Sequence, residues 1–127
     1  MKITDKQIKA VISLSADKRY SHFIKVVCDS EIVWGLNNDG WAMATTNDEQ
    51  EIFPLWPAKE YAEICAKDEW SGYAPESFSI NELIDDLLPN LKNDCVLPGV
   101  FYTPKDKGVI VTVDELLANI NKELEKY

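Results

Sequence analysis

The chain has 127 residues, 46% of them hydrophobic and 28% charged, which is the size and composition of one globular domain spanning residues 1–127. Its net charge is −9 and it contains a single arginine, so it lacks the concentrated positive charge with which nucleic-acid-binding proteins neutralise phosphates. No apolar run approaches the roughly 20 residues of a membrane span, and the N-terminus opens on a polar segment rather than a signal peptide. We therefore expect a cytoplasmic protein that contacts neither nucleic acid nor membrane.

The first 30 residues are predicted to form two helices. Thr4 and Gln7 have the spacing of a capping box, and Ser15 supplies the N-cap at which a second helix begins. Apolar residues recur at helical spacing after each of these starts. They are Ile8, Val11 and Ile12 in the first helix, and Tyr20, Phe23, Ile24 and Val27 in the second.

A basic cluster follows from the same helical spacing. Lys18, His22 and Lys25 fall on a face away from the apolar stripe, with Arg19 beside them. Such a cluster binds a small anion or an acidic partner, or it is an ordinary solvated helix face, which is the commoner case. His22 is the only histidine, and beside two lysines it has no evident acid to orient it as a catalytic base.

The next segment is predicted to form a three-stranded antiparallel meander, with strands over residues 32–36, 41–46 and 51–56. Asn37-Asn38-Asp39-Gly40 supplies the left-handed backbone positions of the first turn. The first two strands contain no charged residue, so we expect both of their faces to be covered. The small residue Gly35, with Ala42 and Ala44, is expected to let a helix approach one face closely.

Two prolines flank the end of the third strand in Phe53-Pro54-Leu55-Trp56-Pro57. Pro54 has no N–H to donate, so we expect the strand to end or to lie at a sheet edge there. Pro57 suits the first position of a helix over residues 58–68. Trp56 is therefore predicted to be buried where the sheet meets this helix.

The remainder is predicted to contain a loop over residues 70–75, two helices and one hairpin. Ser79 with Glu82 forms a second capping box, and Pro89 kinks or ends the helix that it opens. Strands over residues 96–102 and 109–111 form the hairpin, and a third capping box, Thr112 with Glu115, opens the last helix. The fold class is thus α+β: two N-terminal helices, the meander, further helices, and a short C-terminal hairpin plus helix.

The aromatic block resembles that of a known family. Its motifs are Trp34-Gly35-Leu36, Asp39-Gly40-Trp41-Ala42, Phe53-Pro54-Leu55-Trp56-Pro57, Tyr61-Ala62, Cys65, Leu88-Pro89-Asn90-Leu91 and Gly99-Val100-Phe101. Over most of the chain this string resembles the domain of unknown function 2750, a family of small bacterial proteins. The resemblance implies a bacterial, cytoplasmic α+β domain and brings no activity, cofactor or catalytic residue. The strand-then-helix arrangement around Trp56 is also similar to that of secretion-regulator domains of the SseB type.

The sequence contains no recognisable catalytic or metal-binding motif: no Gly-x-Ser-x-Gly, no glycine-rich phosphate loop and no Cys-x-x-Cys. Cys28, Cys65 and Cys95 are odd in number and widely spaced, so we expect three reduced, buried thiols. A zinc site made of these cysteines and His22 is the alternative, although zinc ligands normally come in pairs close in sequence. We expect neither a metal nor another cofactor.

Two surfaces are candidates for binding. Trp70 and Tyr73 form either an exposed aromatic contact or part of the core. Glu82, Asp85, Asp86 and Asp94 cluster around one helix and its exit, within a segment, residues 31–94, that has a net charge of −11. Such a field favours a basic protein partner.

These observations lead to a non-catalytic binding or regulatory module as the foremost hypothesis, for example an accessory or immunity-type protein. A small-ligand-binding protein with a tryptophan-lined pocket is the alternative. An enzyme is the least favoured class, because the usual catalytic groups are missing.

Overall fold

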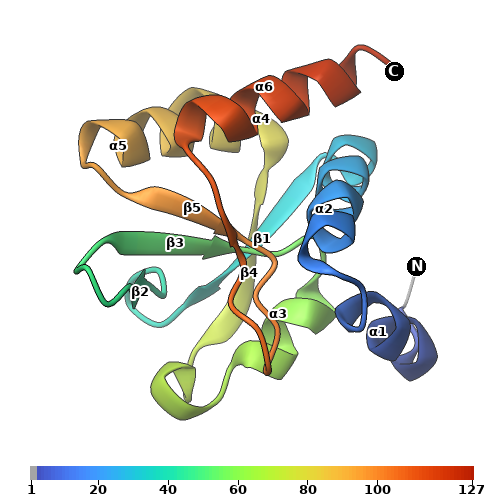
Figure 1. Cartoon of the computed structure of the whole chain (residues 1–127), viewed down its shortest axis with the longest axis vertical. Helices are drawn as coiled ribbons and strands as arrows, with labels where there is room; N and C mark the ends of the chain where they lie inside the picture. Colours follow the sequence, from blue (N-terminus) through green and yellow to red (C-terminus); the bar gives the residue numbers. More distant parts are fainter. Residues whose placement is uncertain (1–2) are drawn as a thin grey trace.

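The computed structural model describes residues 3–127, which form helices packed around two small sheets (Figure 1). The helices are α1 (Asp5–Ile12), α2 (Ala16–Ser30), α3 (Lys59–Cys65), α4 (Ile80–Glu82), α5 (Leu88–Asn93) and α6 (Val113–Leu124), with a 3-10 turn, η1 (Asp68–Trp70), and a π-helical turn, η2 (Leu83–Leu87). The strands are β1 (Ile32–Asn37), β2 (Ala44–Thr45), β3 (Glu51–Leu55), β4 (Ala74–Ser79), β5 (Leu97–Val100) and β6 (Val109–Ile110). The α+β class, the two N-terminal helices and the C-terminal hairpin plus helix are confirmed.

The pairing of the strands differs from the predicted meander. β1 pairs over its whole length with β4, while the second sheet has the order β2-β3-β5-β6, with β3 and β5 parallel. The other edge of β1 begins to pair with the predicted second strand, because the Leu36 carbonyl accepts a hydrogen bond from the Ala42 N–H. Two residues earlier in β1, however, Trp34 pairs with Trp56. The predicted hairpin is therefore very short, because Trp56, which follows β3, occupies the edge of β1 that the second strand was predicted to pair with.

The Trp34–Trp56 pair links the two sheets, and it also explains the position of Pro54. The backbone hydrogen bonds between these tryptophans are 3.0 and 2.9 Å long. Pro54 lies inside β3, so the predicted strand end is wrong, but on its β2 side no strand pairs with it, as the predicted sheet edge requires. On one side it faces Gly99 of β5; on the other, β2 pairs only as far as Ile52. Pro54 therefore lies between the part of β3 that pairs with β2 and Trp56, which pairs with Trp34. No strand needs a hydrogen bond from residue 54 on that side, so the missing N–H of proline is tolerated.

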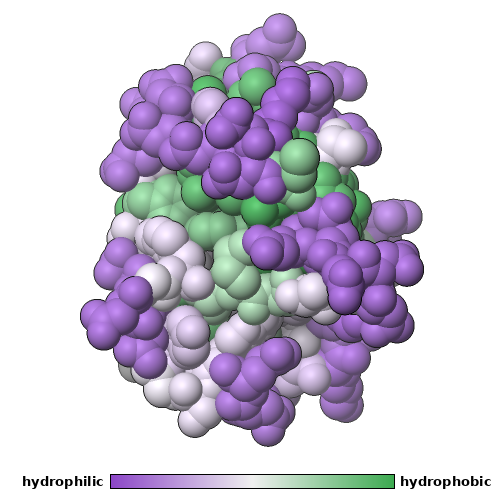
Figure 2. Space-filling model, turned by 90° about the vertical axis from the view of Figure 1, so that its left-hand side faces the viewer, coloured by the Kyte–Doolittle hydropathy of each residue, from purple (hydrophilic) through white to green (hydrophobic). Residues whose placement is uncertain are grey.

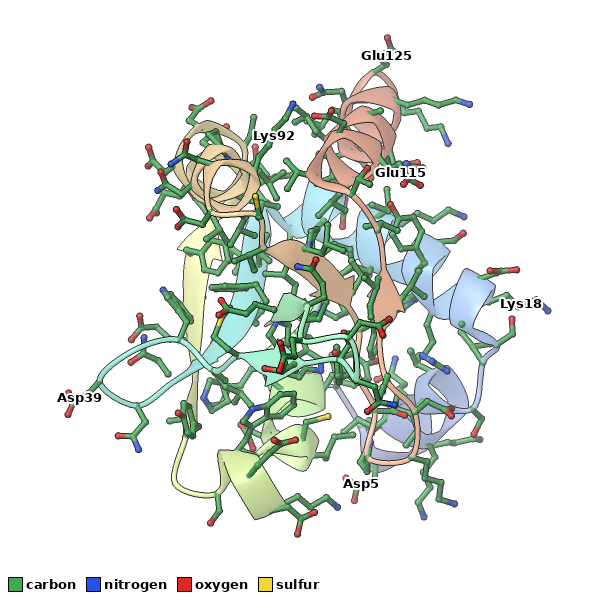
Figure 3. All side chains as sticks on the ribbon, turned by 60° about the vertical axis from the view of Figure 1, so that its left-hand side comes forward. Asp5, Lys18, Asp39, Lys92, Glu115 and Glu125 are labelled. Atoms are coloured by element: carbon green, nitrogen blue, oxygen red, sulfur yellow. The ribbon has the colours of Figure 1, made fainter. Side chains whose placement is uncertain are left out.

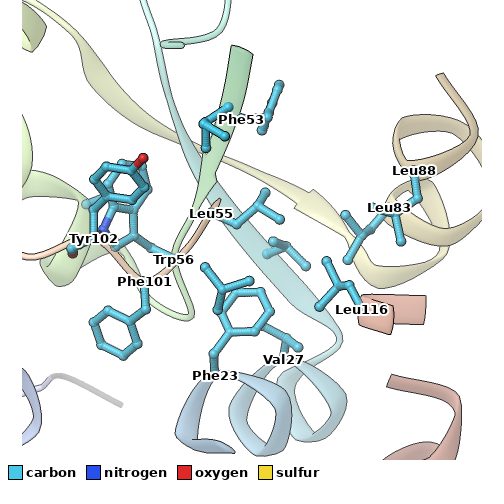
Figure 4. Close-up of a cluster of buried hydrophobic side chains, with 14 of the residues drawn as sticks. Phe23, Val27, Phe53, Leu55, Trp56, Leu83, Leu88, Phe101, Tyr102 and Leu116 are labelled. Carbon is cyan, nitrogen blue, oxygen red and sulfur yellow. Dashed lines mark hydrogen bonds between the residues drawn. The ribbon is translucent and has the colours of Figure 1, made fainter. Parts of the chain in front are cut away.

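The helices close the core on the face of β3 that carries Leu55. Figure 4 shows Phe23 and Val27 of α2 facing Leu55, with Leu83 and Leu116 completing the cluster from the other helices. All five side chains are fully buried. All three predicted capping boxes are formed, so the helix starts at Asp5, Ile80 and Val113 follow the local sequence.

Pro89 does not end the helix that begins at Ile80. Helical backbone continues to Asn93, and the π-helical turn lies just before the proline. There the Leu88 N–H donates to the Leu83 carbonyl, five residues back rather than four. A proline in a regular helix interior loses one hydrogen bond and clashes with the carbonyl four residues earlier, and the wider turn relieves that conflict.

Candidate functional site

Two of the four predicted acidic residues meet in one groove. Glu82 and Asp86 line a groove of about 180 Å³ beside the helix that follows β4. Asp85 is exposed outside it, and Asp94 lies at the C-terminal end of α5. The remaining lining residues are Trp41, Phe78, Leu87 and Asn90. We call these six residues the aromatic–acidic groove.

The aromatic floor of this groove is held in place by packing. The Trp41 ring lies 5.4 Å from Phe78 in a T-shaped arrangement and 5.7 Å from Phe53. It also lies directly against Gly35, where an added Cβ would be 2.9 Å from Trp41 Cζ3. The expectation that this small residue admits a helix is therefore wrong, because it admits the indole ring instead.

The carboxylates at the rim have unused acceptor capacity. Glu82 Oε1 accepts hydrogen bonds from the Ser79 N–H and hydroxyl at 3.4 and 3.3 Å, as part of the capping box. Among residues 3–127, no ion pair involves Glu82 or Asp86. Figure 2 views the molecule from the side of α5 and β2 and shows a band of hydrophobic residues between hydrophilic ones. The groove thus combines an apolar aromatic surface with uncompensated negative charge.

A larger cavity, of about 340 Å³, lies where three separate parts of the chain meet. Its lining comes from β2 and the residue after it, from the end of α3 through η1, and from the segment between β5 and β6 together with Ile110 of β6. Trp70 and Tyr102 supply its aromatic surface, and both are more than nine-tenths buried. Its charged lining residues are Lys67, Lys105, Lys107, Asp68, Glu69 and Asp106. We call this the lysine-rimmed cavity.

For Trp70, the second of the two predicted alternatives holds: it belongs to the core and is not an exposed contact. Its side chain is 7% exposed, and Nε1 donates to the Met43 carbonyl at 3.2 Å. Its ring meets those of Trp56 and Tyr102 edge to face. Tyr73 is half-buried just before β4, a strand that the sequence pattern does not predict. The predicted loop is therefore shorter than expected, because Trp70 ends η1 and β4 begins at Ala74.

The predicted basic cluster does not include Arg19 on the surface of the structure. Lys18 projects from α2 away from the sheets (Figure 3), but Arg19 is only 2% exposed. Arg19 Nη1 donates to the Leu14 carbonyl at 2.7 Å and lies 3.8 Å from Asp106 Oδ2. His22 is half-buried against Tyr61 and Phe101, and burial, followed by the charge of Lys25, lowers its pKa. Arg19 instead ties α2 to the segment between β5 and β6.

Comparison with protein-family models gives one match, described as a protein of unknown function (DUF2750), over residues 20–120. The chain belongs to the DUF2750 family. A search of the curated proteins finds no match.

The DUF2750 match begins in α2 and ends in α6, so it contains both sheets and every lining residue of the groove and the cavity. The resemblance seen in the sequence is thereby confirmed. Within the described part of the chain, no three His, Cys, Asp or Glu side chains are grouped as a metal site. No helix of residues 3–127 is long and apolar enough to cross a membrane.

The three cysteines are free in the structure but differ in their surroundings. Cys28 and Cys65 are buried, and burial raises the pKa of each thiol to about 11. Cys95 is exposed after the end of α5, so the prediction of three buried thiols is wrong for this one. Its backbone adopts a left-handed conformation, φ 59°, which ends the helix and turns it outward.

We expect Cys95 alone to react rapidly with a thiol reagent in the native protein, because the thiolate is the nucleophile and the other two thiols are buried and protonated. Timed labelling with dithiobis(nitrobenzoate) at about pH 8 should find one fast thiol, absent from Cys95→Ser, and three after unfolding. Rapid labelling of Cys65, which lines the lysine-rimmed cavity, would instead mean that this cavity opens readily to solvent.

Proposed function

We propose that this protein is a non-catalytic binding module that docks a basic polypeptide segment in the aromatic–acidic groove. One observation carries the proposal: the groove holds the Trp41 ring beside the uncompensated carboxylates of Glu82 and Asp86. A guanidinium or ammonium group is attracted both to the face of an indole and to a carboxylate. Both attractions favour a cation in the same groove.

The apolar residues of the groove suit the rest of a long cationic side chain. Phe78 and Leu87 line the same groove as the two carboxylates. Arginine and lysine bury their methylene stems on apolar surface while the charged head stays near water and acids. Arginine fits better than lysine here, since its planar guanidinium stacks on aromatic rings and is less strongly hydrated.

Two further features support tight and selective docking. Trp41 is already packed against Gly35, Phe53 and Phe78, so little side-chain entropy is lost when a partner binds. The net charge of −11 over residues 31–94 attracts a basic partner from a distance at low salt.

The proposal is tested with a short arginine peptide and its citrulline counterpart, which has nearly the same shape but no charge. We expect the arginine peptide, acetyl-Gly-Arg-Gly-Arg-Gly-amide, to shift the indole ¹H–¹⁵N resonance of Trp41, assigned by comparison with Trp41→Phe. The citrulline peptide should leave that resonance unchanged. Binding should weaken as salt rises from about 0.05 to 0.5 M, because screening shortens the reach of the carboxylates.

Variants then locate the contact. The double variant Glu82→Gln/Asp86→Asn should lose about tenfold or more in affinity for the arginine peptide, as expected for charge-assisted hydrogen bonds. Glutamine at position 82 retains the capping box, so the helix should be preserved. Asp94→Asn removes a negative charge that lies outside the groove, and it serves as the control. Equal losses in both variants, or equal binding of the citrulline peptide, would contradict docking in this groove.

A further inference from the structure

We infer that the lysine-rimmed cavity is a second binding site, for a small molecule that carries an aromatic ring and an anionic group, such as an aromatic carboxylate. This site is lined by other residues than the aromatic–acidic groove, so it does not depend on the proposed function. Its volume of about 340 Å³ lies within the usual range of small-ligand pockets, roughly 300–1,000 Å³, whereas the groove lies below it.

Two polar groups of the aromatic residues that line the cavity are already hydrogen-bonded. The indole N–H of Trp70 is already bonded to the Met43 carbonyl. The Tyr102 carbonyl is likewise occupied, by the Trp56 N–H at 2.9 Å and the Cys65 thiol at 3.3 Å. What remains toward the cavity is the small exposed part of the two rings, less than one-tenth of each residue's surface, together with the Tyr102 hydroxyl. A flat apolar group packs favourably against an aromatic surface of this kind.

The charges around the cavity favour an anion. Lys67, Lys105 and Lys107 form no ion pair within residues 3–127. Of the three carboxylates in the lining, that of Asp106 already faces Arg19 at 3.8 Å. Together with Arg19, which faces Asp106, the region holds four cationic groups against three carboxylates, in a protein whose net charge is −9.

Arg19, the fourth of these cations, is buried. Its side chain is 3% exposed, and within the described residues its Nε–H has no hydrogen-bond partner. Asp106, which faces it, is 64% exposed and is held by a turn in which the Asp106 N–H donates to Thr103 Oγ1 at 2.9 Å. A buried cation paired only with a solvated carboxylate is incompletely neutralised, so its field extends toward the cavity that Asp106 lines.

Three probes that share one ring and differ in charge test this inference: indole-3-acetate, the neutral indole-3-acetamide and the cationic tryptamine. In calorimetric titrations at neutral pH and low salt, we expect indole-3-acetate to bind at least tenfold more tightly than the other two. It should shift the indole ¹H–¹⁵N resonance of Trp70, assigned with Trp70→Phe, and not that of Trp41. Equal binding of the amide or the amine, absence of binding by all three, or a shift at Trp41 alone would overturn the inference.

Charge-removing variants separate this site from the groove. Lys105→Gln/Lys107→Gln should reduce indole-3-acetate affinity at least tenfold and leave the weak binding of indole-3-acetamide unchanged. Both lysines are exposed, so the melting temperature should be preserved. Lys122→Gln, an exposed position on α6 outside the cavity, is the matched control. Glu82→Gln/Asp86→Asn should bind indole-3-acetate like the parent protein. An undiminished affinity in the Lys105→Gln/Lys107→Gln variant would overturn the assignment of the anion to these lysines.

Discussion

Replacing Trp56 with alanine is expected to lower the free energy of unfolding by about 3–5 kcal/mol, the range for truncating a large buried aromatic residue. Its side chain has no exposed surface, and its Nε1–H donates to the Tyr102 carbonyl at 2.9 Å. Figure 4 shows the ring beside Tyr102 at the end of β3. Alanine leaves a large cavity there and removes one donor to a buried carbonyl.

Urea unfolding of three variants separates these contributions. Trp56→Phe keeps most of the apolar volume but removes the N–H, and should cost less than Trp56→Ala. The Tyr102 carbonyl still accepts from the Cys65 thiol in that variant. Tyr127→Ala, at a position that is 67% exposed, should change stability by less than about 0.5 kcal/mol. A loss below about 1 kcal/mol for Trp56→Ala would show that the indole is not part of the stable core.

Gly99→Ala is expected to destabilise the protein by roughly 1–3 kcal/mol, because it overpacks the centre of the larger sheet. Gly99 lies in β5 between Pro54 of β3 and Ile110 of β6. An added Cβ would lie 2.5 Å from Ile52 Cγ2 and 2.7 Å from Tyr102 Cε1. Neither atom is the end of a flexible chain, so the strands or the ring must move.

A double-mutant cycle with Ile52→Ala tests whether this overlap is the cause. Ile52→Ala removes Cγ2 and should by itself cost about 2–5 kcal/mol, since Ile52 is fully buried. In the double variant the new methyl group enters the space that Ile52 leaves, so the total loss should be smaller than the sum of the single losses by more than about 0.5 kcal/mol. Strict additivity would mean that Gly99→Ala acts through the backbone and not through Ile52.

Only part of the aromatic–acidic groove could be predicted from the sequence. Glu82 and Asp86 were predicted as binding residues because they lie close together on one helix, and they line the same groove. Phe78 was not predicted to contribute, because its strand, β4, has the sequence Ala-Pro-Glu-Ser-Phe-Ser, which lacks strand-like alternation. Trp41 was predicted as a sheet residue, yet its position in the groove depends on Gly35, on β1, and on Phe78, on β4.

The sequence by itself determined the features that depend on near neighbours along the chain. The three capping boxes join residues three apart, and the apolar stripe of Phe23, Ile24 and Val27 repeats within two helical turns, so each is encoded locally. The tertiary structure alone decided which strands pair: β1 bonds with β4, about 40 residues away, and β3 runs parallel to β5. It also decided that Arg19 is buried, because the residue that faces its guanidinium, Asp106, arrives from the far end of the chain. The residues of a strand edge or of an ion pair do not indicate in the sequence which distant residue they will contact. These contacts are therefore decided only when distant segments pack around a common core.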